Sequence, residues 1–299
     1  MHAYLPAIGF SSIKSNRAVE YIAEEVVERY TKKSVFHSED GRLMAEYSKL
    51  FAKNAGVTVC GELDEEGEFH PDYVYPFYKG YQVTSNEEVS IEEQTGKDAY
   101  SGAFDDVRIG ITIIFYMTNM PEYLQLKESK LLKPGKNKVI LSGLAMDGTI
   151  LLPVRRTKAM EAIRRQEDQK RVSLMNAARD GDEEAIESLT MQDMDIYSHL
   201  SERLVREDIL SIVESYLMPC GVECDQYNIL RYIRRVEVAK NIVTGDKLYD
   251  MLVVCNDMIF NICVNTKDVM GEPEVGRRFK GRIWLQGEIA FSGRKWSLL

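Results

Sequence analysis

The last twenty-four residues, Gly276 to Leu299, constrain the fold most strongly, because they combine a strand pattern with dense positive charge. Four apolar residues alternate there with polar ones, the period-two pattern of a strand with one buried face: Ile283, Leu285, Ile289 and Phe291. The segment has one acidic residue and six basic ones: Arg277, Arg278, Lys280, Arg282, Arg294 and Lys295. Since the whole chain has a net charge of -9, this local positive charge indicates an anionic partner or an acidic patch elsewhere on the molecule.

The composition favours a cytosolic globular protein. With 299 residues, of which 44% are hydrophobic, the chain can bury the core of one large domain or two ordinary ones. Its five cysteines are sparse, which favours a reducing compartment over a disulfide framework. The N-terminus lacks the features of a signal peptide, and no run approaches the ~18 apolar residues of a membrane-spanning helix. We therefore expect a cytoplasmic protein with no membrane partner.

Two helices are predicted in the first fifty residues. Ser15 or Asn16 is placed to cap a helix that runs to about Tyr30, because apolar residues fall on one helical face between them. Residues 43–52 look like a second, short helix. The apolar face of the first helix is expected to lie in the core.

The sheet of the first half is predicted from three later segments. Residues 107–117 alternate as a strand with one covered face, after an acidic stretch at 87–106 that we interpret as a solvated loop. Runs at 138–146 and 149–154 flank Asp147-Gly148, a dipeptide typical of tight turns. These two runs therefore predict a β-hairpin.

The chain then changes from helical to strand character. Residues 155–179 are charged and rich in helix formers, and a further helix is predicted from about Arg203 to Met218, where Pro219 ends it. Four strand-like runs follow, at residues 227–239, 247–255, 258–265 and 278–291. They predict an antiparallel meander that closes as a small barrel.

The predicted fold class is α+β. An N-terminal mixed or antiparallel sheet with helices occupies residues 1–154, a helical connector occupies 155–218, and the β-rich, barrel-like region occupies 219–299.

Arginines at the start of the first and last of these four strands are the main candidates for binding. If the two strands lie side by side in a closed barrel, their cations form one patch that faces an anion, with Tyr232 and Phe279 among them. The candidate residues for an anion or partner are Arg231, Arg235, Arg277, Arg278, Lys280 and Arg282.

An aromatic ribbon at residues 70–81 is a second candidate surface. Pro71 and Pro76 mark it as an edge strand, with rings on both faces. Core packing is its ordinary interpretation, and a protein contact or a base-stacking platform is the alternative. The candidate surface rings are Tyr73, Tyr75 and Tyr78, together with Tyr232.

Motifs for catalysis, metals and cofactors are missing. The chain has no nucleotide-binding glycine motif, no serine-nucleophile elbow and no zinc-protease motif, so we assign no catalytic residue and no cofactor. The four histidines are isolated, and we assign no metal ligand. A four-cysteine metal site, from Cys220, Cys224, Cys255 and Cys263, is a minor alternative.

Long phrases of the chain resemble a known family. They include MHAYLPAIGF at the start, GDEEAIESLTMQDMDIYS in the middle, and the run from SYLMPCGVECDQY through CND to GEPEVGRRFKGRIWLQGEIAF. They are similar to an uncharacterised family from clostridial bacteria that is known only as a domain of unknown function. The resemblance implies a bacterial cytosolic protein and brings no activity or site with it.

Three functions are compatible with the sequence. The preferred hypothesis is a non-catalytic binding or protein-interaction module, whose basic-aromatic patch meets an acidic protein or a small anion. The second is an accessory protein for single-stranded nucleic acid, which uses the same region with the aromatic ribbon. The third is an enzyme with a carboxylate site assembled only in the fold, from Asp105, Asp106 and Glu288.

Overall fold

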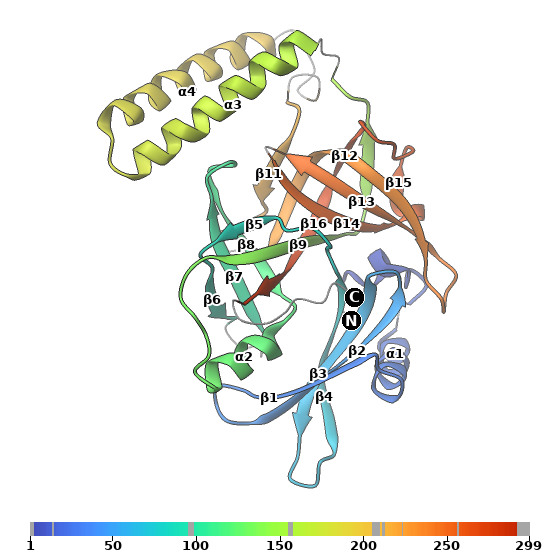
Figure 1. The fold of residues 1–299 in the computed structure, drawn as a ribbon. Coiled ribbons are helices and arrows are strands. Elements are labelled where there is room, and N and C mark those ends of the chain that lie inside the picture. Colours follow the sequence, from blue (N-terminus) through green and yellow to red (C-terminus); the bar gives the residue numbers. More distant parts are fainter. Residues whose placement is uncertain are drawn as a thin grey trace.

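The structure, a computed structural model, describes residues 3–13, 15–94, 99–154, 158–204, 210, 213–222, 224–255 and 257–291 (Figure 1). The side chains of residues 158–165, 168, 196–204 and 255 are not described. Helices, one antiparallel sheet and one mixed sheet are all present, so the predicted α+β class is confirmed. No helix within the described part of the chain has the length and apolar character needed to cross a membrane.

The first sheet contains four antiparallel strands in the order β1-β2-β3-β4. It is preceded by the 3-10 helix η1 (Leu5–Ile8) and the helix α1 (Asn16–Glu28). The strands are β1 (Lys32–His37), β2 (Leu43–Ala52), β3 (Ala55–Leu63) and β4 (Phe69–Tyr78). The predicted helix α1 is confirmed, and the Ser15 side chain accepts a hydrogen bond from the Ala18 amide at its N-terminus.

The predicted helix at residues 43–52 is wrong, because this segment is strand β2. Its residues have a high helix propensity as isolated residues. In the fold, however, β2 is a central strand that pairs with β1 on one side and β3 on the other. Tertiary pairing therefore overrides the local preference.

The larger sheet has twelve strands among the residues that the structure describes. Those of the first half are β5 (Ser85–Glu87), β6 (Ser90–Glu93), β7 (Tyr100–Asp106), β8 (Ile111–Met117), β9 (Asn137–Ala145) and β10 (Gly148–Leu151). The short helix α2 (Met120–Glu128) lies between β8 and β9. The predicted loop at 87–106 is thus wrong in part, because it contains β6 and β7, and the strand predicted from residue 107 begins at Ile111.

The remaining strands come from the end of the chain. They are β11 (Tyr216–Pro219), β12 (Gln226–Lys240), β13 (Lys247–Cys255), β14 (Met258–Asn265), β15 (Val269–Met270) and β16 (Arg278–Ala290), with the 3-10 helix η2 (Thr266–Asp268) before β15. The four predicted strands are confirmed. Strands β13 and β14 are joined by a short turn, with Cys255 opposite Met258 and Asp257 at a φ of 61°.

Strand pairing in the larger sheet closes on itself. The order β12-β13-β14-β9-β16 returns to β12, because β12 also pairs with β16. Strand β9 from the first half is thus inserted between β14 and β16, in parallel with β14 and antiparallel to β16. The predicted hairpin of β9 with β10 is wrong, because β10 pairs instead with β15 and β16.

Two apolar cores lie on the two sides of this ring. The enclosed side carries residues such as Ile229, Phe260 and Ile283. The second core lies between the ring, the four-stranded sheet, α1 and η1, and includes Val59 and Trp284. The ring therefore has an apolar inside and, over part of its outside, a buried junction with the first sheet.

Two long helices follow β10 and stand apart from the strands (Figure 1). They are α3 (Lys158–Arg179) and α4 (Glu183–Leu204). The helix predicted from Arg203 to Met218 is wrong at its end, because Tyr216 begins strand β11. Residues 205–209 and 211–212 of that prediction lie outside the described part of the chain, as do Arg155 and Arg156. Strands before and after the predicted connector at 155–218 belong to the same larger sheet. The division into domains at 1–154, 155–218 and 219–299 stays a prediction.

Candidate functional site

The two arginine-bearing strands lie side by side, as predicted, but their arginines do not share a face. Cross-strand pairing sets Arg231 opposite Phe279 and Tyr232 opposite Arg278. Opposite residues point to the same face of a sheet and successive residues to opposite faces. Arg231 therefore lies on the enclosed side of the ring, fully buried, and Arg278 lies on the outer side. The predicted single cationic face is wrong.

Arg278 holds the polypeptide at the base of the helices. Its side chain donates to the carbonyl oxygens of Leu152, Leu210 and Val213, each at 3.0 Å. The residue is only 4% exposed. Its charge is therefore directed at backbone carbonyls rather than at the solvent.

The other predicted cations are nearer the surface. Lys280 and Arg282 are exposed, and Arg282 donates to the Gln226 side chain at 2.7 Å. Arg277 forms an ion pair with Glu274 at 2.8 Å. Arg294 and Lys295 lie outside the described part of the chain.

The aromatic ribbon is the edge strand β4, but its rings point into the protein. Tyr75 and Tyr78 are 3% and 2% exposed, and Tyr73 and Tyr232 are half-buried. The Tyr75 ring lies 5.1 Å from that of Tyr116 on the larger sheet. The surface interpretation is therefore wrong for Tyr75 and Tyr78, and a base-stacking platform would need these rings exposed.

The three carboxylates proposed for an enzyme site do not meet. Asp106 lies opposite Ile111 at one end of β8, whereas Gly287, next to Glu288, lies opposite Met117 at the other end. Six residues of strand separate these ends by about 20 Å. Asp106 is buried and accepts hydrogen bonds from Arg108, so it also has a structural role.

The four cysteines proposed for a metal site are also separated. Cys263 is opposite Asp250, five strand residues from Cys255, which corresponds to about 17 Å. Cys263 is buried against the Ala7 carbonyl, and burial raises the pKa of its thiol well above the ordinary value. Cys220 and Cys224 lie beyond β11, at its turn toward β12.

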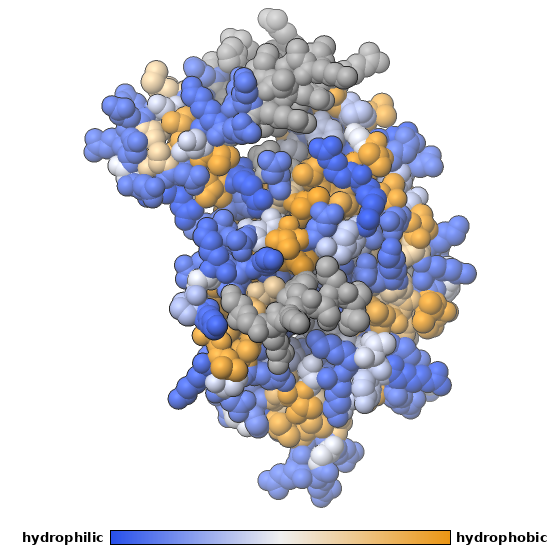
Figure 2. Space-filling view, in the orientation of Figure 1, coloured by the Kyte–Doolittle hydropathy of each residue, from blue (hydrophilic) through white to orange (hydrophobic). Residues whose placement is uncertain are grey.

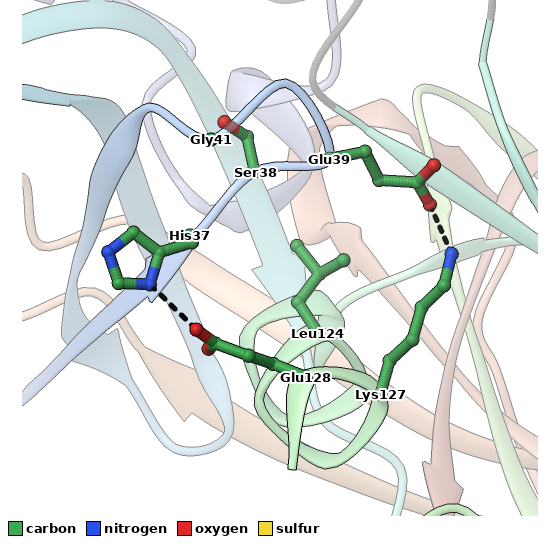
Figure 3. Close-up of a pocket in the computed structure, with 7 residues that line it drawn as sticks. All are labelled: His37, Ser38, Glu39, Gly41, Leu124, Lys127 and Glu128. Atoms are coloured by element: carbon green, nitrogen blue, oxygen red, sulfur yellow. Dashed lines mark hydrogen bonds and ion pairs between the residues drawn. The ribbon is translucent and has the colours of Figure 1, made fainter. Parts of the chain in front are cut away.

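A depression of about 460 Å³ lies between α2 and the turn that joins β1 to β2 (Figure 3). Its polar groups are paired across the opening: Lys127 Nζ lies 2.5 Å from Glu39, and His37 Nδ1 lies 3.1 Å from Glu128. The hydrogen bond from Lys127 holds the pKa of Glu39 below its ordinary value. A ligand would have to break these pairs, so the depression is a weak candidate.

An exposed cluster of Asp64, Glu68 and His70 sits at the tip of the β3–β4 hairpin. One carboxylate oxygen of Asp64 accepts hydrogen bonds from the backbone amides of Glu66 and Glu68, and the other oxygen lies 2.8 Å from His70 Nε2. These contacts are the hydrogen bonds of a turn, which account for the cluster without a ligand.

Another group of polar side chains lies where β12, β13 and β14 meet the end of β4. Cross-strand pairing sets Arg235 opposite Leu252 and Leu252 opposite Asn261, so Arg235 and Asn261 share the outer face of the ring. Asp250 lies two residues before Leu252 and points to the same face. With two rings from the end of β4 and the following loop they form what we call the junction site: Tyr78, Tyr81, Arg235, Asp250 and Asn261.

The end of β4 is fixed in place over this face. The Gln286 side chain accepts a hydrogen bond from the Tyr78 amide at 3.0 Å and donates one to the Pro76 carbonyl at 2.9 Å. Ser142 on β9 donates to the Tyr78 carbonyl. Gln286 and Ser142 are buried, so these bonds hold Tyr78 rigidly against the larger sheet.

Some polar groups of the junction site satisfy one another. Asn261 Nδ2 donates to Asp250 Oδ1 at 2.9 Å, and the Arg235 guanidinium lies 4.5 Å from the centre of the Tyr81 ring. At the rim, Glu237 lies 2.7 Å from Lys53 Nζ and 3.5 Å from Arg235 Nε.

Four other polar atoms of the site are buried and form no hydrogen bond of ordinary length and angle with the described residues, although longer polar contacts link Tyr78 to Asp250 and Tyr81 to Asn261 and Arg235. They are the hydroxyls of Tyr78 and Tyr81, Nε of Arg235 and Oδ2 of Asp250. Tyr78 and Asp250 are only 2% and 4% exposed. A buried polar atom that lacks its hydrogen bond entirely costs about 1–3 kcal/mol, so a cluster of four atoms with only long contacts is a candidate ligand site.

The tyrosines of the site are donors at neutral pH. Burial raises the pKa of Tyr78 well above its ordinary value, and the neighbouring Asp250 carboxylate raises it further. Burial also raises the pKa of Tyr81. The site therefore presents three donors, two hydroxyls and one guanidinium nitrogen, beside one carboxylate acceptor.

The sequence prediction found part of this site. Arg235 and Tyr78 were among the candidate residues, and Tyr81 belonged to the aromatic ribbon. Asp250 and Asn261 were missed, although each is a polar residue within an otherwise apolar strand run, which is the signal that indicates a buried polar site.

Comparison with known families gives a match over most of the chain. The family described as "Domain of unknown function, E. rectale Gene description (DUF3881)" matches residues 5–287. Searches among curated proteins and among solved structures found no match.

Proposed function

The protein belongs to the DUF3881 family, and we propose that it is a non-catalytic binding protein whose junction site holds a small organic anion. This proposal keeps the small anion predicted from the sequence and moves its site from the strand start at Arg231 to Arg235. The sparse cysteines favour a reducing compartment, so the proposal places the protein in the bacterial cytosol.

The observation that carries the proposal is the convergence of four buried polar atoms that have only long polar contacts, 3.5 Å or more for Arg235 Nε, among the described residues. They come from β4 with its following loop, β12 and β13, yet they are linked through contacts of Asp250 with Asn261 and of Arg235 with Tyr81. Small-ligand sites commonly have such a few fixed polar groups in largely apolar surroundings. The half-buried Arg235 and Tyr81 place the rim of the site within reach of solvent.

The chemistry of the site selects the ligand class. Arg235 Nε and the two hydroxyls are donors that suit a carboxylate. Asp250 Oδ2 is an acceptor, which suits a hydroxyl or amino group on the same ligand. We therefore expect a small hydroxy- or amino-carboxylate to bind better than a simple carboxylate.

Isothermal titration calorimetry of the full chain with glycine, lactate, acetate and phosphate tests this proposal. Glycine or lactate should bind more tightly than acetate, which offers Asp250 no donor. Tyr81→Phe keeps the ring under Arg235 and removes one donor, and Arg235→Met removes the cation. Each should weaken binding by about tenfold or more, the usual effect of losing a hydrogen bond to a charged group.

Tyr21→Phe is the matched control, because Tyr21 is 57% exposed on α1, away from the junction site. It should leave the affinity unchanged. The proposal fails if none of the four probes binds at millimolar concentration, or if the two site variants bind a probe as tightly as the wild type. A crystal structure that shows only ordered water joining Tyr78 and Asp250 would agree with that failure.

A further inference from the structure

The helices α3 and α4 form an antiparallel hairpin, which we call the arm (Figure 1). Each helix has 22 residues and is therefore about 33 Å long. Gly181, at a φ of 90°, makes the turn between them, and Asp182 accepts the Ala185 amide at the start of α4. The tip is held to the body by Arg179, 3.4 Å from Asp105 on β7.

The side chains of the arm that the structure describes are mostly exposed or half-buried. Among the side chains of both helices that the structure describes, Ala185 alone is buried. Three apolar residues of α4 are widely exposed: Ile186 at 48%, Met191 at 64% and Met194 at 69%. Figure 2 shows apolar side chains among the charged ones on the arm.

Long helices in proteins owe most of their stability to packing of one face. Among the described residues of the arm, apolar side chains such as Val172, Met175 and Leu189 are half-buried, and an ion pair of 2.7 Å between Arg171 and Asp193 joins the two helices. The face of α4 that carries Met191 and Met194 has no such cover among the described residues. Flexible methionines on an exposed face are typical of surfaces that pack against another helix. The arm therefore has the properties of half an interface.

The charges of the two helices indicate which partner covers the exposed face of the arm. Helix α3 has six basic and three acidic residues, whereas α4 has one basic and six acidic residues. A two-fold symmetric contact must be self-complementary, because the same surface occurs on both copies. A surface with one basic and one acidic helix side by side meets this condition when α4 of each copy faces α3 of the other.

We propose that the arm docks on the arm of a second copy of this chain, forming a four-helix bundle that covers Met191 and Met194. This interface is independent of the junction site and of any ligand there. Its apolar centre comes from α4, and its opposite charges set the pairing of the helices.

Sedimentation equilibrium of the full chain tests the proposal over about 1–100 µM, the range in which a moderate interface dissociates. We expect a dimer at low salt whose dissociation constant rises with ionic strength, because the exposed charges are screened. The double change Met191→Lys and Met194→Lys should weaken the dimer at least tenfold.

Met270→Lys is the matched control, because Met270 is 73% exposed on β15, outside the arm. Circular dichroism should show the same helix content in all variants, since the changed residues are exposed. The proposal is overturned by a monomer throughout this range, or by a dimer that the arm variant leaves intact. A monomer would point instead to a different protein as the occupant of the arm.

Discussion

Replacing Glu46 by glutamine should change how the stability of this protein depends on pH. Glu46 lies on β2 between the two sheets and is 6% exposed. Burial raises its pKa from 4.5 to about 7, although the charge of Lys32 and a hydrogen bond from Tyr75 oppose the shift. That hydrogen bond, from the Tyr75 hydroxyl to Glu46 Oε1, is 3.3 Å long.

The size and sign of the effect follow from this shift. The folded protein keeps the Glu46 proton at pH values where the unfolded chain has released it. The contribution of this proton to the free energy of unfolding is fully present below pH 4.5 and is lost as the pH rises through 7. At about 1.36 kcal/mol per pH unit, the difference between 4.5 and 7 corresponds to about 3 kcal/mol.

Urea unfolding of the wild type and of Glu46→Gln at about pH 5 and pH 8 measures this contribution. Glutamine stays neutral, so the variant should gain about 2–3 kcal/mol relative to the wild type between these pH values. Glu24→Gln, on the exposed face of α1, is the matched control and should show no such gain. The reasoning is refuted if the stability difference between Glu46→Gln and the wild type is the same at both pH values.

Three further predictions concern the fold, and urea unfolding checks each of them. Arg278→Met should lower the free energy of unfolding by about 3–5 kcal/mol, because three carbonyl oxygens lose a charged donor. Lys280→Met, at an exposed position, should change it by no more than about 0.5 kcal/mol. Equal losses would contradict the structural role of Arg278. Gly287→Ala should destabilise by about 1–3 kcal/mol, because an added Cβ would lie 2.5 Å from the Phe115 ring, and a neutral result would mean that this ring can move. Ser15→Ala should cost about 1 kcal/mol by removing the cap of α1, and an unchanged stability would show that water replaces it.

The strands of the last third could be predicted from the sequence because their signal is local. Each of β12, β13, β14 and β16 alternates polar and apolar residues or forms a short apolar run bounded by turn residues, and the structure confirms all four. Helix α1 could be predicted for the same reason, from its cap and its apolar face. The error at β2 shows the limit of local signals, because its helix-favouring residues form a strand once β1 and β3 pair with it.

The junction site shows what the sequence left open. Tyr78 and Arg235 were candidates separately, but they stand 157 positions apart, and nothing in either segment indicates that they meet. Arg231 and Arg278 were predicted to share a face, yet the pairing register placed them on opposite faces of the same two strands.

The sequence by itself determined the α+β class, the four strands β12, β13, β14 and β16 and the positions of the charges. Only the tertiary structure decided which strand lies beside which, since β9 from the first half enters the ring between β14 and β16. Pairing between distant strands depends on backbone groups that every residue carries, so the side-chain pattern of one strand does not identify its neighbour. A shift of one residue in that pairing exchanges the buried and exposed faces, and it is this choice that buried Arg231 and gathered Arg235, Asp250 and Asn261 beneath Tyr78.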